Sequence, residues 1–210
     1  MLRARARVAR RRPARVRARA PRAPRAPTRG LRGARAALMR AFVFLDRDGT
    51  LIEDRHYAHA LADYVPLPGA YEAVRALRAA GFCTAIVSNQ SGIGRGLFSE
   101  ADHARFESHL LADFAAHGAP LDAAYHCPHE PDVGCDCRKP RPGLLERARR
   151  EHGIDLAASW VVGDKESDIA LARNAGCAAV QIGAGARKDG IPVAPTLLVA
   201  VQRYVLAPDR

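Results

Sequence analysis

The chain has 210 residues, of which 48% are hydrophobic, and a formal net charge of +11. This length supports one ordinary domain with a substantial core, and no stretch approaches the 18 apolar residues of a membrane span. Five cysteines, an odd number without a secretion signal, favour a reducing compartment such as the cytoplasm over a disulfide framework.

The positive charge is concentrated at the start of the chain. Residues 1–38 hold 14 Arg and no Lys, Asp or Glu, so 11 minus 14 leaves the other 172 residues at −3. Arg, Ala and Pro make up almost all of this segment, which predicts a disordered extension. Three alternatives each lack an expected feature: a nucleic-acid arm would have interleaved aromatics, a transit peptide would have serines, and an export signal would have a following apolar stretch. The simplest interpretation is that translation starts at Met39.

Short apolar runs alternate with helical stretches in the body of the chain. Nearly continuous apolar residues, typical of strands covered on both faces, occupy residues 41–46, 82–88, 123–127, 159–164 and 177–183. Start and stop signals predict helices over residues 69–80, 100–117, 142–152 and 167–175, with a capping box formed by Ser99 and Asp102. The alternation predicts a three-layer, Rossmann-like α/β fold with a mainly parallel sheet, whose ligands bind at the carboxyl ends of the strands.

We assign residues 39–190 to this domain and residues 191–210 to a C-terminal segment that packs on the domain or trails from it. The slightly acidic body predicts neither a nucleic-acid nor a membrane partner, and we expect a monomer.

Two aspartates follow the first predicted strand. Asp46 and Asp48 are separated by one residue, so both project to the same side of an extended chain, and Arg47 is expected to turn away. Gly49 then permits a sharp turn. Paired carboxylates suit Mg²⁺, although Asp-Gly is also a common turn dipeptide and alone would predict only a turn.

Polar groups follow the other predicted strands as well. Ser88, Asn89, Gln90 and Ser91 supply hydroxyl and amide groups suited to phosphate oxygens after the second strand. Arg138 and Lys139 supply cations after the third strand, and Asp164, Lys165 and Asp168 follow the fourth. Parallel strands bring these motifs to one edge of the sheet, which favours a phosphate site over a simple turn.

The order of these motifs resembles the haloacid dehalogenase (HAD) superfamily of phosphatases. The motifs are Asp-x-Asp-Gly-Thr, then Ser88, then Lys139 before a proline, then Gly-Asp-x-x-x-Asp. The chain is similar to its branch of heptose bisphosphate phosphatases and histidinol-phosphatases over about residues 41–185. The resemblance implies Asp46 as nucleophile and Asp48 as general acid and base. It also implies that Asp46, the backbone carbonyl of Asp48 and Asp164 bind Mg²⁺, and that Ser88 and Lys139 stabilise the phosphoryl group. We expect Asp168 to support Lys165 or the metal shell.

A second cluster lies between the third strand and Arg138. Its three thiols and one imidazole fall within 11 residues, at Cys127, His129, Cys135 and Cys137. Four such ligands form a closed, structural Zn²⁺ site, and the resembling family has zinc ligands at these positions. A redox pair or coincidence is the alternative. Cys83 and Cys177 lie in apolar runs and are expected in the core.

The substrate is expected to be a small phosphorylated sugar. No large cap domain fits between the first two strands, so loops must contact the substrate. Resemblance implies sugar contacts from Asp54, His56, Tyr57 and Arg138, and the candidate set also includes Asn89, Gln90, Ser91 and Lys165. Alternatively, Tyr57 packs and His56 is merely solvated. The Asn-Gln-Ser-Gly-Ile-Gly-Arg-Gly motif around Gln90 and the Gly-Asp-Lys motif resemble the heptose branch, which implies a heptose 1,7-bisphosphate from which the C7 phosphate is removed. The short zinc loop also resembles histidinol-phosphatases, and another small phosphomonoester is a further alternative.

Overall fold

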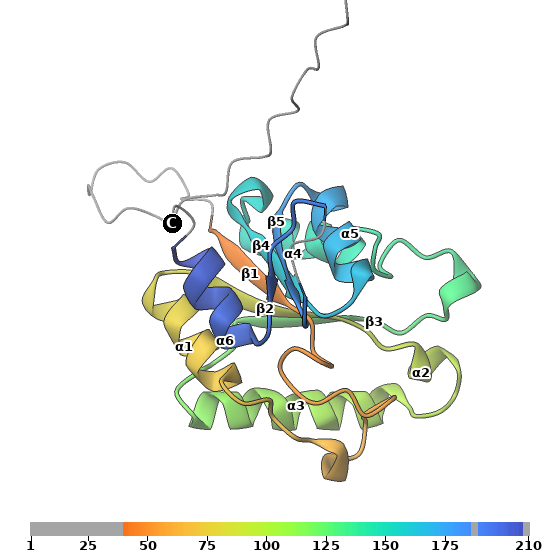
Figure 1. Ribbon diagram of the computed structural model, residues 1–210. Coiled ribbons are helices and arrows are strands. Elements are labelled where there is room, and N and C mark those ends of the chain that lie inside the picture. The colour runs from red at the N-terminus through yellow and green to blue at the C-terminus, as the bar shows by residue number, and fades with distance from the viewer. Residues whose placement is uncertain (1–39, 186–188, 208–210) are drawn as a thin grey trace, which may run out of the picture.

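The computed structural model describes residues 40–185 and 189–207. Its centre is a six-stranded sheet in the order β3-β2-β1-β4-β5-β6, in which every neighbouring pair is parallel (Figure 1). The strands are β1 (Phe42–Leu45), β2 (Cys83–Asn89), β3 (Ala123–Cys127), β4 (Trp160–Gly163), β5 (Ala178–Ile182) and β6 (Val193–Ala194). This sheet confirms the predicted α/β fold. The Arg-rich extension and Met39 lie outside the described residues.

Both faces of the sheet are covered, as the apolar runs predict. Phe42 and Phe44 of β1 join one hydrophobic cluster, whereas Val43 and Leu45 join the other, because successive side chains of a strand point to opposite faces. All four side chains are at most 1% exposed. Because both faces of such apolar strands are covered, the sheet is the middle of three layers.

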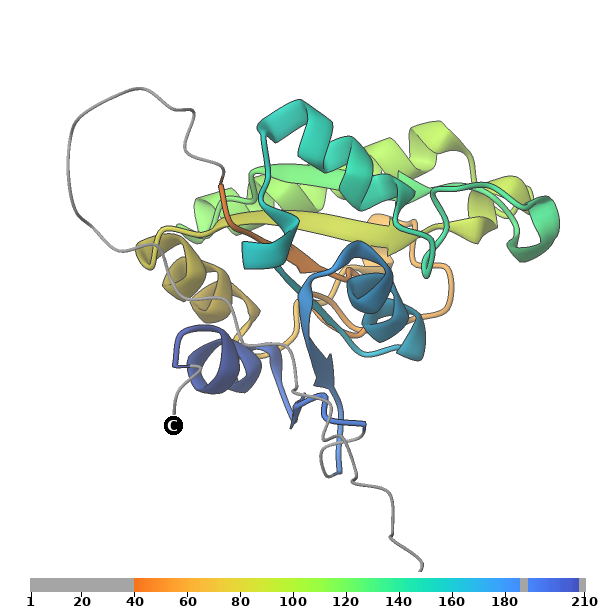
Figure 2. The ribbon, with the colours of Figure 1, turned by 90° about the horizontal axis from the view of Figure 1, so that it is seen from above.

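Helices form the two outer layers (Figure 2). On one face, α1 (Ala70–Ala79), α3 (Glu100–Ala116) and α6 (Leu197–Ala200) supply apolar side chains to the cluster that contains Val43. On the other face, α4 (Gly143–His152) and α5 (Glu166–Ala175) pack on the cluster that contains Phe44. The predicted helices agree with these bounds to within one residue. The capping box is also present: Ser99 accepts from the Asp102 backbone N–H, and Asp102 accepts from that of Ser99.

The C-terminal part contains elements that the sequence pattern did not predict. Strand β6 pairs with β5, and α6 continues into a π-helix over Val201–Val205. Leu197, Val201 and Val205 are buried in the same cluster as Val43. A two-residue strand and a single helical turn are too short to produce a recognisable hydrophobic period.

The expected burial of two cysteines was wrong. Cys83 and Cys177, expected in the core, are only half-buried and lie at its margin. Strand β5 begins after Cys177, so this residue belongs to the turn that follows α5.

The connections leave the carboxyl edge of the sheet accessible. The chain between β1 and β2 consists of loops, a short 3-10 helix (Leu61–Asp63) and α1, and a short α2 (Ser91–Gly94) follows β2. Every residue between β1 and β2 is described, and no cap domain lies among them. Between β1 and β4 the strand order reverses direction, and such a switch point is where α/β folds bind ligands.

Candidate active site

The motifs predicted to carry chemistry meet at the carboxyl edge, on both sides of the switch point. Asp46 directly follows β1, and its backbone N–H donates to the Val162 carbonyl of β4 at 3.0 Å. This bond extends the ladder by one residue and fixes the place where the Asp46 side chain leaves the sheet. Asp164 follows β4 in the same way. The central strands therefore present two carboxylates side by side.

Lys139 lies at the bottom of the site and contacts two carboxylates. Its Nζ is 2.8 Å from Asp46 Oδ1 and 2.6 Å from Asp168 Oδ1, and it donates to the Val87 carbonyl at 2.9 Å. All three charged side chains are at most 5% exposed. Burial alone would lower the pKa of Lys139, but the charges of Asp46 and Asp168 outweigh it and raise this pKa. Lys139 is therefore held as a cation beside Asp46.

A third carboxylate leaves this region with surplus negative charge. Asp46, Asp164 and Asp168 each offer an oxygen, and these oxygens lie within 4.8 Å of one another. Burial and the charge of Asp46 raise the pKa of Asp164, and the same two causes raise that of Asp168 to about 6 despite its pairing with Lys139. Asp164 Oδ1 is buried without a hydrogen-bond partner. One lysine does not balance three carboxylates, so the donor set suits a divalent cation.

Gly49 is required for this close approach. It has φ +82°, and a Cβ built on it would lie 2.5 Å from Asp164 Oδ2. A side chain at this position would therefore be strained and would also displace the Asp164 carboxylate.

The prediction for Arg47 was wrong. Arg47 does not turn away: it is 1% exposed, and its Nε and Nη2 each donate to the Asp48 carboxylate at 3.0 Å. It also donates to the Ala58 carbonyl at 2.9 Å and lies 4.7 Å from the centre of the Phe106 ring. Alternation in a strand does not apply here, because the chain leaves the strand at Leu45 and turns at Gly49. The guanidinium is thus a buried clamp on Asp48.

Gln90 completes this clamp. Its side-chain amide donates to Asp48 Oδ2 at 3.1 Å and to Ser88 Oγ at 2.6 Å, and its oxygen accepts from Arg47 at 3.2 Å. Gln90 is 3% exposed. Its polar atoms are occupied by protein partners, so it holds Asp48 and Ser88 in place.

Asn89 has a similar supporting geometry. Its side chain accepts from the Lys139 backbone N–H at 3.0 Å and donates to the Lys139 carbonyl at 3.2 Å. These two bonds tie the end of β2 to the segment that carries Arg138 and Lys139. The buried cation is therefore positioned through its backbone as well as through its carboxylate partners.

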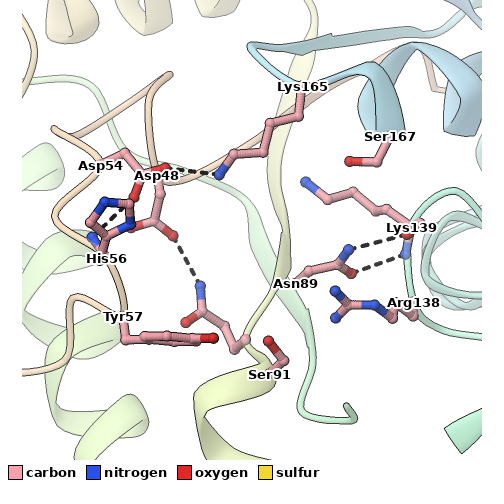
Figure 3. A pocket seen from close by; sticks show the side chains of 11 residues that line it. Asp48, Asp54, His56, Tyr57, Asn89, Ser91, Arg138, Lys139, Lys165 and Ser167 are labelled. Atoms are coloured by element: carbon pink, nitrogen blue, oxygen red, sulfur yellow. Dashed lines mark hydrogen bonds and ion pairs between the residues drawn. The ribbon is translucent and has the colours of Figure 1, made fainter. Parts of the chain in front are cut away.

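A pocket of ≈ 330 Å³ opens above these groups and falls within the size range of small-molecule sites. It is lined by all eight residues predicted to contact substrate, together with Asp48, Lys139 and Ser167: Asp54, His56, Tyr57, Asn89, Gln90, Ser91, Arg138 and Lys165. Figure 3 shows Arg138, Lys139 and Lys165 on one side of the pocket, facing His56 and Tyr57. Two cations, Arg138 and Lys165, thus lie at its rim in addition to Lys139 below.

The first loop shapes the opposite wall. His56 and Tyr57 have φ of 45° and 62°, a left-handed conformation that is uncommon for such residues, and the His56 N–H donates to Asp54 Oδ1 at 3.2 Å. Tyr57 is 42% exposed, so it does not pack in the core as the alternative interpretation expected. Lys165 Nζ reaches across the pocket to Asp54 Oδ2 at 3.0 Å (Figure 3). This ion pair joins the two walls at the rim.

The cysteine and histidine ligands predicted for zinc also converge. Cys127 Sγ lies 3.6 Å from Cys135 Sγ and 3.2 Å from Cys137 Sγ, and His129 Nδ1 lies 3.2 Å from Cys137 Sγ. These separations far exceed a disulfide bond of about 2.0 Å. A tetrahedral zinc with bonds of about 2.3 Å would hold two sulfurs about 3.8 Å apart. The cluster thus has the size of a four-coordinate metal site, and its loop leads directly to Arg138.

Sequence reasoning missed the supporting role of Arg47 and the main partner of Asp168. Arg47 carried no signal beyond its position between the aspartates, because its contacts with Ala58 and Phe106 require the folded loop and α3. Asp168 was expected to support Lys165 or the metal shell. It accepts from the Lys165 backbone N–H at 3.1 Å, but its closest charged partner is Lys139.

Fold and site together define a class of protein. A parallel three-layer α/β fold with two aspartates after β1, a buried lysine and further aspartates after β4 is that of HAD-type phosphatases, which hydrolyse phosphoric monoesters. A family model described as "HAD-hyrolase-like" matches residues 136–204.

The relatives narrow this class. A D-glycero-beta-D-manno-heptose-1,7-bisphosphate 7-phosphatase of Pseudomonas aeruginosa is 38% identical over 169 residues, covering 77% of this chain and 93% of the relative. A D-glycero-alpha-D-manno-heptose-1,7-bisphosphate 7-phosphatase of Burkholderia mallei is 41% identical over 141 residues, covering 64% and 75%. The crystal structure of the D,D-heptose 1,7-bisphosphate phosphatase of B. bronchiseptica, complexed with magnesium and phosphate, has a TM-score of 0.72 and 31% identity, covering 79% and 98%.

This chain belongs to the HAD superfamily and, within it, to the family of heptose 1,7-bisphosphate 7-phosphatases.

Proposed function

We propose that the protein hydrolyses the C7 phosphate of D-glycero-D-manno-heptose 1,7-bisphosphate through an aspartyl-phosphate intermediate. The observation that carries this proposal is the separation of the cations in one pocket: Lys139 lies beside Asp46 at the bottom, whereas Arg138 and Lys165 lie at the rim. A sugar with two phosphates can place one beside the nucleophile and the other at the rim. The relatives' names support this substrate over histidinol phosphate.

Asp46 is the nucleophile of the proposal. Its carboxylate attacks the phosphorus in line with the bond to the sugar oxygen, so an acyl phosphate forms as the P–O bond to the sugar breaks. Lys139, 2.8 Å from Asp46 Oδ1, and the hydroxyl of Ser88 stabilise the charge of the transferring phosphoryl oxygens. Water then attacks the acyl phosphate and releases inorganic phosphate and free Asp46.

Asp48 is the general acid and base. It donates a proton to the departing sugar oxygen and later accepts one from the attacking water, so the two transfers cancel over a full turnover. Arg47 and Gln90 orient its carboxylate through three donated hydrogen bonds. They also limit its rotation between the two steps.

Mg²⁺ fits the aspartates that surround this nucleophile. Asp46, Asp164 and the backbone carbonyl of Asp48 would bind it, and the partnerless Asp164 Oδ1 is the free donor that such an ion requires. When bound, the ion neutralises charge on the phosphate oxygens during transfer. Asp168 pairs with Lys139 and positions it beside Asp46.

Zn²⁺ fits the cluster of Cys127, His129, Cys135 and Cys137. Four protein ligands leave no position for substrate, so this ion has a structural role. Arg138 donates to the His129 carbonyl at 3.3 Å, and Arg141 donates to that of Cys135 at 2.7 Å. The ion would therefore fix the loop that presents Arg138 to the pocket.

The remaining proposals concern the setting of the enzyme. Within the described part of the chain, no helix combines the length and apolar character that a membrane crossing requires. We keep a monomer in the cytoplasm, without nucleic-acid partners, as our proposal.

The test is the release of phosphate from both anomers of the heptose bisphosphate and from histidinol phosphate. We expect a higher kcat/KM for one heptose anomer, one phosphate released per molecule, and heptose 1-phosphate as the product seen by phosphorus NMR. Asp46→Asn should abolish release, because an amide is not a nucleophile for phosphorus. Retained turnover in this variant would remove the assigned nucleophile, and a preference for histidinol phosphate would overturn the substrate.

A further inference from the structure

A second group of metal-binding side chains lies outside the pocket. Glu100 and His103 come from the first turn of α3, and His126 comes from β3. One ligand atom from each lies within 4.8 Å of the others. His126 Nε2 is 3.0 Å from Glu100 Oε2, and the rings of His103 and His126 are 4.0 Å apart at their centres. None of the three lines the pocket.

Local geometry brings these residues together. Glu100 and His103 are three positions apart on a helix, so their side chains lie on the same face, as in the Glu-x-x-His metal motifs of helical bundles. His126 and Cys127 are consecutive on β3 and therefore point to opposite faces of the sheet. Cys127 contributes to the predicted zinc cluster, whereas His126 points to the face covered by α3.

An independent observation concerns His103. Its side chain is buried, with 1% exposed, and its Nε2 has no hydrogen-bond partner. Buried polar atoms in folded proteins are nearly always paired, so this nitrogen requires an explanation. A metal ion bound to Nε2 would provide the missing partner.

The charges around the cluster also suit a dication. Glu107 lies one turn further along α3, and its Oε1 is 3.9 Å from His103 Nε2. Two carboxylates and two neutral imidazoles balance one divalent ion. The cation that faces the cluster is Arg47, which packs on Phe106 of the same helix and is paired with Asp48. Two nitrogen donors favour Zn²⁺ and similar transition metals over Mg²⁺.

We propose that Glu100, His103 and His126 bind a second Zn²⁺, which fastens the start of α3 to the end of β3. This site is separate from the cluster of Cys127, His129, Cys135 and Cys137, called the thiolate cluster below. It does not depend on the proposed catalytic function. It joins the helix that supports Arg47 to the strand that leads into the zinc loop.

The test counts zinc ions per chain in the untagged, full-length protein. Weakly bound metal is removed with a mild chelator, and the protein is dialysed against limited Zn²⁺ in excess Mg²⁺, which occupies the aspartate site. Elemental analysis should find two zinc ions in the natural chain and one in His103→Gln or Glu100→Gln. Cys135→Ser should lose the other ion. His109→Gln, an exposed histidine of the same helix, should keep two.

Cobalt distinguishes the two sites. Co²⁺ in the thiolate cluster gives an intense sulfur-to-metal charge-transfer band, whereas Co²⁺ bound by His and Glu gives only weak visible bands. Glu100→Gln should keep the intense band and lose the weak component, with the affinity for the second ion reduced at least about a hundredfold. Because Glu100 is 57% exposed and Gln has the same shape, this variant should fold normally.

Two results would overturn the proposal. One is a single zinc ion in the natural chain, bound with the intense cobalt band. The other is unchanged binding of two ions, with unchanged affinity, in both His103→Gln and Glu100→Gln.

Zinc should also raise the melting temperature of Cys135→Ser but not that of Cys135→Ser combined with Glu100→Gln. Equal shifts in these two proteins would count against the site.

Discussion

The bottom and the rim of the pocket each contain a lysine paired with aspartate, but in different surroundings. At the bottom, Lys139 pairs with Asp46 and Asp168, and all three side chains are at most 5% exposed. At the rim, Lys165 pairs with Asp54, and their side chains are 49% and 35% exposed. An ion pair in solvent contributes little to stability, whereas breaking a buried pair leaves an uncompensated charge in the interior.

This difference separates two tasks. The bottom holds charged groups at fixed positions, as the transfer of a phosphoryl group requires. The rim presents Lys165, which solvent can reach and which a substrate can recruit from Asp54, and Arg138 beside it. We therefore expect changes at the bottom to reduce kcat and stability, and changes at the rim to raise KM.

The largest expected effect is that of replacing the buried Lys139 with methionine. Lys139→Met should lower the free energy of unfolding by about 3–5 kcal/mol, because two buried carboxylates lose their cation. It should also lower kcat about a hundredfold to a thousandfold, the usual effect of removing one group that stabilises charge in the transition state. Denaturant titration and steady-state kinetics measure the two quantities.

Lys165→Met is the matched control. Its free energy of unfolding should change by less than about 1 kcal/mol, because the pair with Asp54 is exposed. KM should rise roughly tenfold, the effect of about 1.4 kcal/mol of lost binding, while kcat stays within a few-fold. If both substitutions had the same effect on kcat and stability, the contrast between bottom and rim would be wrong.

Gln90 tests how firmly the bottom must hold Asp48. Gln90→Leu removes the hydrogen bonds to Asp48 and Ser88 without removing a charge. We expect kcat to fall about tenfold to a hundredfold, part of what general acid catalysis contributes, with KM nearly unchanged.

Gln202→Leu, on the exposed side of the C-terminal helix, controls for the loss of an amide. An unchanged kcat in Gln90→Leu would mean that Arg47 alone orients Asp48.

The sequence alone predicted the site residues that can be recognised from a short segment of the chain. Asp46, Asp48 and Asp164 follow apolar strands, and a parallel sheet brings all strand ends to one edge, so their proximity required no knowledge of packing. The thiolate cluster was recognisable for a similar reason, since its four ligands fall within one loop.

The rest depends on tertiary contacts. The side chain of Arg47 is directed by Ala58 in the loop after β1 and by Phe106 in α3, and strand alternation gave the wrong direction for it. The two carboxylates on Lys139 come from the end of β1 and from the first turn of α5, so the buried triad is visible only after folding. The cluster of Glu100, His103 and His126 was not predicted, because it needs α3 to dock against β3.

Zinc in the thiolate loop should influence the rim more than the bottom. Cys135→Ser removes one of four ligands and frees the loop that presents Arg138, whereas Lys139 remains fixed by Asn89 and by its buried partners. We expect KM to rise up to about tenfold, equivalent to up to about 1.4 kcal/mol of binding, with kcat within a few-fold. Kinetics combined with metal analysis measure this. A fall in kcat at constant KM would show that the loop controls the bottom of the pocket.

Salt should give the smallest effect and act on the rim alone. Raising sodium chloride from 0.1 to 1 M shortens the Debye length from about 10 to about 3 Å, which screens the exposed Lys165 and the half-buried Arg138 from an approaching phosphate. With Mg²⁺ held constant, KM should rise a few-fold, whereas kcat should change little because Lys139 and Asp46 are shielded from solvent. The salt dependence of KM should be weaker in Lys165→Met, since one screened charge has been removed. If salt lowered kcat instead, solvent ions would have to reach the buried lysine, and the distinction between bottom and rim would fail.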